Sequence, residues 1–184
     1  MTEATKIPGW VAGTWVIDPI HSEIGFTVRH LMVSKVRGRF EKFEGQIVTG
    51  EDILDTRATV TVDLTSINTG NEDRDNDLRS ANYLEVDKHP TMTYRSTGLK
   101  PDGDAYIAEG ELTIRETTRP LQLRVEFHGT GTDPWGGTRA GLSATGEINR
   151  KDFGVSFDMP MEGGGLVVGE KIQLDLDIEA VLQQ

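Results

Sequence analysis

Apolar and polar residues alternate along most of this chain. The alternation is clearest near the C-terminus, where Ile172, Leu174 and Leu176 are separated by charged or amide side chains. A period of two places the apolar side chains on one face of a β-strand and the polar ones on the other. The pattern recurs, between turn-forming residues, over 43–49, 57–67, 91–99, 106–114, 121–127 and 140–148. Half-buried antiparallel strands are therefore the predicted building blocks.

The first long alternating stretch runs from Asp18 to Phe43, and we interpret it as one long ribbon. Phe26 and Val28 begin a face that continues, at every second position, through His30 and Ser34. These two polar residues interrupt an otherwise apolar face. Either they orient a ligand in a pocket, or they are core groups with satisfied hydrogen bonds.

Between the strands, residues 69–87 break the alternation. This segment is dense in Asp and Asn, and its apolar residues, Leu78 among them, are spaced to suit one or two helical turns. Asn71 or Asp73 is suited to cap the first turn. The pattern predicts one short helical crossover, at about residues 71–85, over one end of a sheet.

The chain offers about eight or nine strands, and the connections are too short for helical crossovers except once. This arrangement favours an all-β fold in which an antiparallel sheet closes into a barrel. A barrel of eight strands either fills with side chains or holds one small ligand. Small residues share the inward parity at many positions: Ala58, Ala108, Gly110, Ala140, Ala144, Gly146 and Ala180. They predict an elongated apolar cavity, unless large residues on facing strands fill the gaps.

Composition narrows the class of protein. The 184 residues, with 36% hydrophobic and 27% charged, suit a single domain spanning 1–184. A formal net charge of -11 argues against nucleic acid as the main partner, because such binding depends on Lys and Arg. Cysteine is absent, which excludes disulfides, thiolate metal sites and thiol nucleophiles.

The N-terminal stretch has Glu3 and no apolar run of the length that a signal peptide needs. We therefore expect a cytoplasmic protein. No stretch approaches the length of a transmembrane segment. Whether the chain forms a homodimer is left open by these patterns.

Signals for catalysis are weak. The four histidines show no helical metal-ligand spacing, and the chain has no Gly-x-Ser-x-Gly elbow and no phosphate-cradling loop. We therefore expect no catalytic residue, no metal site and no cofactor. The alternative is a lipid-modifying isomerase or cyclase with His30 or His21 as acid or base, although neither has an identifiable tuning partner in the sequence.

A basic run stands out against the acidic chain, and Arg37 and Arg39 are at its centre. Their odd positions place them opposite Phe26 and Phe40 on a regular strand. One interpretation is a solvated edge strand that resists aggregation. The other is a patch that binds a phosphate or acidic headgroup at the mouth of the barrel, and Arg37 and Arg39 are its candidates.

Several segments together resemble one family, the YceI-like family of polyisoprenoid-binding, lipocalin-like proteins. The first begins with an Asp-Pro turn and His-Ser and continues as an alternating strand through Arg-His-Leu. The others are RDNDLRSANYLEVDKHPTMTYRS (74–96), GELTIRETTRPLQL (110–123), DPWGGTRAG (133–141) and INRKDFGV (148–155). In order, these segments cover nearly the whole chain.

The resemblance implies an eight-stranded lipocalin-like barrel that binds, without covalent chemistry, an isoprenoid quinone, a polyprenyl phosphate or another long amphiphilic lipid. A carrier of this kind acts by transport or sequestration. Carried over by position, the expected ligand-binding residues are Phe26, His30, Met32, Val36, Phe40, Tyr83, Leu84, Met92, Tyr94, Leu112, Phe127, Leu142, Phe153 and Phe157.

Overall fold

The computed structural model describes residues 7, 9–31, 33–158 and 168–184. Its strands are β1 (Gly13–Ile17), β2 (Glu23–His30), β3 (Ser34–Phe40), β4 (Phe43–Thr49), β5 (Arg57–Asp63), β6 (Ile67–Asn68), β7 (Thr91–Asp102), β8 (Ala105–Ile114), β9 (Thr117–Thr132), β10 (Thr138–Asn149) and β11 (Val168–Leu182). Its helices are α1 (Glu72–Arg79) and the 3₁₀ turns η1 (Ile53–Asp55), η2 (Leu64–Ser66) and η3 (Arg150–Phe153).

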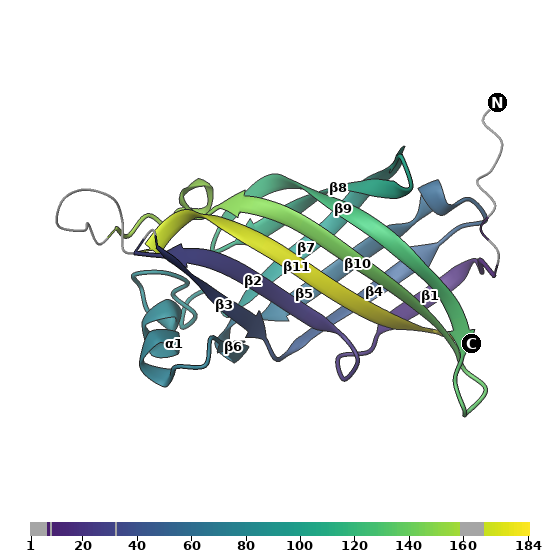
Figure 1. The fold of residues 1–184 in the computed structure, drawn as a ribbon, viewed down its shortest axis with the longest axis horizontal. Helices are drawn as coiled ribbons and strands as arrows, with labels where there is room; N and C mark the ends of the chain where they lie inside the picture. Colours follow the sequence, from purple (N-terminus) through teal and green to yellow (C-terminus); the bar gives the residue numbers. More distant parts are fainter. Residues whose placement is uncertain (1–6, 8, 32, 159–167) are drawn as a thin grey trace.

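The strands close into an antiparallel barrel. Its ring is β1-β4-β5-β7-β8-β9-β10-β11, and pairing of β1 with β11 closes it (Figure 1). The ring is extended at one end by β2, β3 and β6. β2 continues β1 along the same edge of β11. β3 pairs with β2, and β6 pairs with β3. Three strands of the barrel are thus each divided into two consecutive pieces, which are β1 and β2, β3 and β4, and β5 and β6. The prediction of an eight-stranded antiparallel barrel is confirmed.

The ribbon predicted over residues 18–43 is instead a hairpin of β2 and β3. His30 pairs with Ser34 across a turn in which Leu31 has a φ of 55°. A loop of three residues keeps both flanking positions on the same face, so alternation alone does not reveal the turn. The Ser34 hydroxyl donates a hydrogen bond to the His30 carbonyl at 3.3 Å across this turn, and Ser34 is exposed. Ser34 therefore stabilises the turn.

The predicted crossover is present but shorter than residues 71–85. Helix α1 begins after Asn71, whose Oδ1 accepts a hydrogen bond from the Arg74 amide at 3.0 Å. It ends at Arg79, and the chain continues through turns until β7 begins at Thr91. In Figure 1, α1 lies beside β3 and β6 at the end of the barrel where the β2–β3 hairpin also turns. We call this the α1 end.

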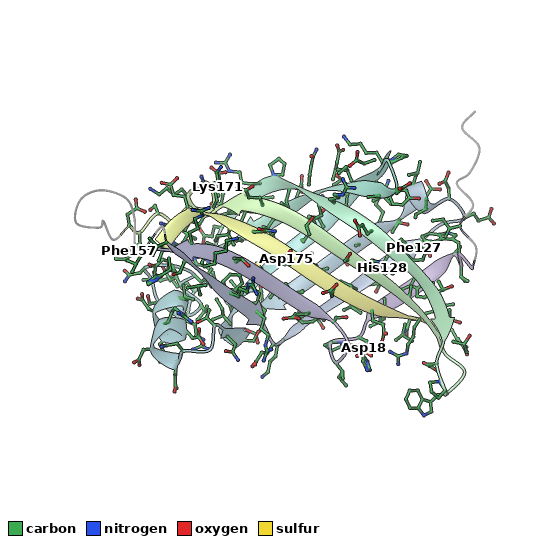
Figure 2. The ribbon with its side chains drawn as sticks, in the orientation of Figure 1. Asp18, Phe127, His128, Phe157, Lys171 and Asp175 are labelled. Carbon is green, nitrogen blue, oxygen red and sulfur yellow. The ribbon has the colours of Figure 1, made fainter. Side chains whose placement is uncertain are left out.

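The alternating side chains sort between the two faces of the wall. On β11, Lys171 and Asp175 are exposed on the outside, as is His128 on β9 (Figure 2). The apolar residues face inward and form two clusters, one with Trp15, Leu64 and Ile178 and the other with Leu112, Leu121 and Leu123. Leu84, Met92 and Leu176 contact both clusters. The interior is therefore continuous along the barrel.

Candidate functional site

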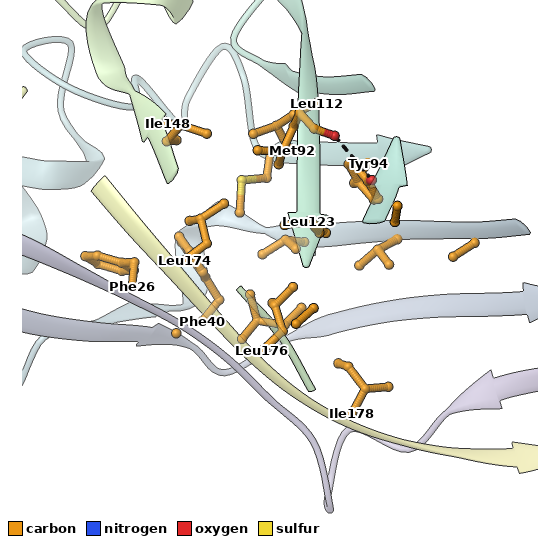
Figure 3. A pocket seen from close by; sticks show the side chains of 18 of the residues that line it. Phe26, Phe40, Met92, Tyr94, Leu112, Leu123, Ile148, Leu174, Leu176 and Ile178 are labelled. Atoms are coloured by element: carbon orange, nitrogen blue, oxygen red, sulfur yellow. Dashed lines mark hydrogen bonds between the residues drawn. The ribbon is translucent and has the colours of Figure 1, made fainter. Parts of the chain in front are cut away.

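An apolar cavity of about 340 Å³ lies inside the barrel, and every strand of the ring contributes to its wall. Figure 3 shows side chains such as Met92, Leu123 and Leu174, from different strands, directed toward the same space. The volume falls in the range of pockets that hold small-molecule ligands. Most of the lining side chains are aliphatic or aromatic, so the cavity suits an apolar guest.

Small wall residues contribute to this space in two ways. The inward alanines all line the cavity: Ala58, Ala108, Ala140, Ala144 and Ala180. At Gly110, an added Cβ would lie 2.5 Å from the Tyr94 ring, and at Gly146 it would lie 2.7 Å from Leu123. The two glycines therefore make room for large neighbouring side chains, as the alternative interpretation held. The open space borders the alanines.

Most of the residues expected to bind a ligand lie around this one cavity. The cavity-lining members of the predicted set are Phe26, His30, Val36, Phe40, Tyr83, Leu84, Met92, Tyr94, Leu112, Phe127 and Leu142. Met32 lies outside the described residues. That these side chains contact a ligand stays a prediction.

Phe153 and Phe157 do not line the cavity. Phe153 ends the 3₁₀ turn η3 and is buried in the apolar cluster that contains Leu112. The Phe157 ring packs edge-on against Tyr83, with centroids 5.6 Å apart. The inward positions expected for both residues were carried over from the family. This segment forms a turn, and the alternation of inward and outward side chains in a strand does not apply to a turn.

The charged lining residues gather at the α1 end. They are Arg29, Arg74, Asp77 and Arg150, and His30 lies with them, while the remaining described lining is uncharged. The Arg74 guanidinium donates to the Thr69 hydroxyl at 2.7 Å and to the Thr69 carbonyl at 2.6 Å, which fixes it at this rim. The cavity therefore has a polar end and an apolar interior.

Arg37 and Arg39, the candidate headgroup residues, lie on the outer face of β3. Both are exposed, and Arg39 is 3.6 Å from the Glu41 carboxylate. Neither is part of the cavity lining. Their headgroup role stays a prediction, and Arg74 is the better placed cation for a ligand inside the barrel.

His21 lies outside the cavity, in a polar cluster on the surface between β1 and β2. Its Nδ1 is 2.8 Å from Asp18 Oδ2, and Arg139 Nη1 donates to both Asp18 and Glu179 at 2.8 Å. Hydrogen bonds from His21 and Arg139 lower the pKa of Asp18 to about 2. Asp18, His21 and Glu179 are close enough together to hold a metal ion. Arg139 already supplies positive charge there, which disfavours a cation.

Tyr83 and Tyr94 contribute phenol groups to the cavity wall. Burial raises the pKa of Tyr94 to about 12, and its hydroxyl is 3.5 Å from the Leu121 carbonyl. Burial also raises the pKa of Tyr83. Both phenols are therefore neutral at physiological pH and act as weakly polar parts of an apolar wall.

Two residues that shape the site are absent from the predicted set. Arg150 is 3% exposed and donates to four backbone carbonyls and to Asp158, which fixes the segment after β10. Trp10 lines the cavity from the N-terminal segment. A lone arginine in a turn and a tryptophan outside any alternating stretch carry no periodic signal, so the alternation of apolar and polar residues does not reveal them.

A closed antiparallel barrel around an apolar cavity has the architecture of a lipocalin-like barrel. Residues 15–180 match the YceI-like domain. Protein YceI of Shigella flexneri is 35% identical over 177 residues, covering 95% of this chain and 90% of that protein. The chain belongs to the YceI-like family.

Solved structures show the same fold. BcnA of Burkholderia cenocepacia superposes with a TM-score of 0.77 at 18% identity, covering 89% of this chain and 98% of that one. A polyisoprenoid binding domain from Saccharophagus degradans gives a TM-score of 0.67 at 16% identity, covering 94% and 100%. Among the described residues, none of the helices has the length and apolar character to cross a membrane.

Proposed function

We propose that this protein binds and carries a long amphiphilic lipid, such as an isoprenoid quinone or a polyprenyl phosphate, without changing it chemically. The observation that supports this most is the apolar cavity, whose wall includes residues from every strand of the ring. The fold shared with a polyisoprenoid binding domain adds support. The carrier function follows from the capacity to hold an apolar chain away from water.

The energetics of an apolar chain suit such a site. Each buried methylene contributes about 0.8 kcal/mol, so ten of them contribute about 8 kcal/mol before the cost of association is subtracted. A rigid barrel whose cavity already exists loses little further entropy on binding. Affinity should therefore rise with chain length and depend little on hydrogen bonds.

The uneven charge distribution orients the ligand. The polar headgroup would lie at the α1 end, near Arg74 and His30, and the apolar chain would extend into the uncharged interior. An anionic headgroup gains charge-assisted hydrogen bonds from a guanidinium that is already held in place by Thr69. Arg37 and Arg39, on the outer face, would act only on a headgroup that projects beyond the barrel.

An enzyme that isomerises or cyclises a lipid is the alternative. His30 lines the cavity and His21 does not, so His30 is the only one of the two placed to act on a bound chain. A catalytic base needs a group that tunes its pKa. Within the described part of the chain, no side-chain hydrogen bond to the His30 ring is present, and the carrier function is favoured.

Organic extraction of the purified protein tests the function. The expected result is recovery of an unchanged amphiphilic lipid, identified by mass spectrometry, and rebinding of that lipid by the extracted protein. Turnover of the added lipid, abolished by His30→Ala, would favour the enzyme. If no lipid is recovered and none rebinds, the carrier proposal is wrong.

Arg74→Gln tests the orientation. The variant should weaken binding of a polyprenyl phosphate by roughly tenfold, through loss of a charge-assisted hydrogen bond, and leave the matching polyprenyl alcohol nearly unaffected. The matched control is the double variant Arg37→Gln and Arg39→Gln, measured in the same titration. A larger loss in the control than in Arg74→Gln would place the headgroup at the outer patch instead.

A further inference from the structure

We infer that Trp10 is the stop that sets the longest lipid chain the cavity accepts. The inference rests on the proposed lipid-binding function and goes beyond it by assigning a specificity residue. Trp10 precedes residue 15, where the match to the family domain begins. It therefore belongs to a part of this chain that the family match does not cover.

Trp10 spans the mouth of the barrel opposite the α1 end. Its Nε1 donates to the Gly50 carbonyl, directly after β4, at 2.9 Å. Its ring packs edge-on against Phe127 of β9, with centroids 5.5 Å apart and planes at 75°. In the ring of eight strands, β4 and β9 are four steps apart in either direction. The indole thus bridges diametrically opposite walls.

Neighbouring backbone contacts hold the indole in this position. Thr130 of β9 donates to the Gly9 carbonyl at 3.1 Å, and Thr49 of β4 donates to the Val11 carbonyl at 2.8 Å. Gly9 has a φ of +79°, and a Cβ there would lie 2.6 Å from the Thr130 hydroxyl. Only glycine suits that conformation and that close approach. Ile7 and residues 9–12 therefore form a strap across the mouth.

This closure has a chemical consequence for the ligand. Among the described residues, charged lining side chains are confined to the α1 end, so under the proposed function the headgroup lies there and the chain extends toward Trp10. An apolar tail that reaches the indole cannot pass through it without displacing the strap. A longer chain must then leave methylenes in water at the α1 end, and each one forgoes about fourfold in affinity.

The experiment uses a series of polyprenyl alcohols that differ only in their number of isoprene units. Dissociation constants are measured by titration for the wild type, Trp10→Ala and Trp10→Phe. In the wild type, affinity should rise with length and then stop rising. In Trp10→Ala the rise should continue, so that the longest alcohols bind about tenfold tighter or better than to the wild type, while the shortest are unchanged. Trp10→Phe keeps a ring in the mouth and should behave almost like the wild type.

Two further variants control for folding and for loss of a tryptophan. Trp135→Ala removes an 84% exposed tryptophan from the β9–β10 turn and should leave the length profile unchanged. Gly9→Ala keeps the indole but crowds the strap against Thr130, so its limit should shift to longer chains, as in Trp10→Ala. Thermal unfolding checks that each variant is folded.

The outcomes separate the inference from the function on which it rests. If the wild type binds the alcohols but neither Trp10→Ala nor Gly9→Ala moves the length limit, the stop is elsewhere and the inference is wrong. A loss of affinity by the same factor at every length in Trp10→Ala would also overturn it. If the wild type binds no alcohol of any length, the carrier function itself fails, and the inference fails with it.

Discussion

The two ends of the barrel are closed by different chemistry. At the α1 end, arginines fix the covering segments: Arg150 holds the turn after β10, and Arg115 holds the crossover through the Tyr83 carbonyl and the Glu85 carboxylate. At the opposite end, one indole bridges the walls, and the lining residues that the structure describes there are uncharged. One end depends on charge-assisted hydrogen bonds, the other on an aromatic contact and on hydrogen bonds between neutral groups.

This difference matches the two parts of an amphiphile. A polar headgroup needs donors and partial contact with water, which the arginine-rich α1 end provides. A hydrocarbon tail needs only exclusion of water, which an aromatic ring across a narrow mouth provides. The barrel wall is continuous between the two ends, so under the proposed function the ends would decide which way a ligand lies. Substitutions at each end should therefore have effects of different kinds.

The largest expected effect is at Arg150. Its guanidinium is 3% exposed and donates to the carbonyls of Val155 and Phe157 at 2.9 and 2.8 Å and to Asp158 at 2.8 Å. Arg150→Met should lower the free energy of unfolding by about 3–5 kcal/mol, because it leaves buried acceptors without partners. Urea denaturation followed by circular dichroism measures this.

The matched control is Arg124→Met, which breaks an exposed ion pair with Asp102. Exposed pairs contribute about 0–1 kcal/mol, so this variant should be close to the wild type. Equal losses in the two variants would mean that the α1 end does not depend on its buried arginine.

A second, smaller loss of stability is expected at Arg115, whose side chain makes stabilising hydrogen bonds while its backbone adopts an unfavourable left-handed conformation. Its φ is +56° in the β8–β9 turn, and its side chain bonds Tyr83, Glu85 and Gly154. Arg115→Ala loses the contacts and keeps the left-handed conformation, at a cost of about 1–3 kcal/mol. Arg115→Gly loses the same contacts but suits that conformation, so it should be about 1 kcal/mol less destabilising than Arg115→Ala.

Chemical denaturation of both variants gives the comparison. A glycine variant less stable than the alanine variant would show that the turn does not keep a positive φ. In that case the side-chain contacts alone account for Arg115.

The smallest expected effect concerns the surface cluster around Asp18, between β1 and β2. Asp18 has a folded pKa of about 2, below its ordinary value of 3.8, because His21 and Arg139 donate hydrogen bonds to it. A carboxylate with a lowered pKa stabilises the folded state above its unfolded pKa, and this stabilisation is lost as pH falls from about 4 to about 2. Asp18→Asn should lower the Tm at neutral pH.

The pH profile distinguishes charge from packing. In Asp18→Asn the Tm should fall less steeply than in the wild type over that acid range. Some pH dependence should remain, because hydrogen bonds from Arg139 to Asp133 and from Lys151 to Asp158 also lower the pKa of those two carboxyl groups. Parallel Tm curves for the two proteins would contradict a role for the Asp18 charge.

The sequence predicts those parts of the fold in which apolar and polar residues alternate regularly. Strands such as β4 and β11, whose inward and outward faces differ, were predicted because alternation reports directly on a wall between water and an apolar interior. The β2–β3 hairpin was not, because its loop preserves parity. Asn71 was correctly named as one of two candidate caps, since its side chain is the local signal for a helix start.

The cavity lining was predicted on the strands and, at Tyr83 and Leu84, also in the turns after α1, but not around the 3₁₀ turn that follows β10. Leu112 and Leu142 line the cavity as their parity requires, whereas Phe153 lies in a 3₁₀ turn and does not. Whether an inward glycine leaves space depends on the neighbouring strand, as Tyr94 beside Gly110 shows. Trp10 closes the barrel through contacts with residues far away in the chain, which no local pattern encodes.

The central claim is that the cavity is open space for a lipid chain, and Ala144→Trp tests it most directly. Ala144 lines the cavity from β10, so an indole there would occupy the path of the chain. Excluding five methylenes should weaken binding of a long polyprenyl alcohol by about 4 kcal/mol, or nearly a thousandfold. The Tm should change little, because the ring fills existing space.

The control is Thr145→Trp, which places the same ring on the exposed outer face of the same strand and should leave both binding and Tm unchanged. The measurement pairs a thermal melt with a lipid titration on the wild type and both variants. The account predicts lost binding and a retained Tm for Ala144→Trp alone. A much lower Tm for Ala144→Trp, together with a wild type that binds no lipid, would mean that the barrel is filled by its own side chains.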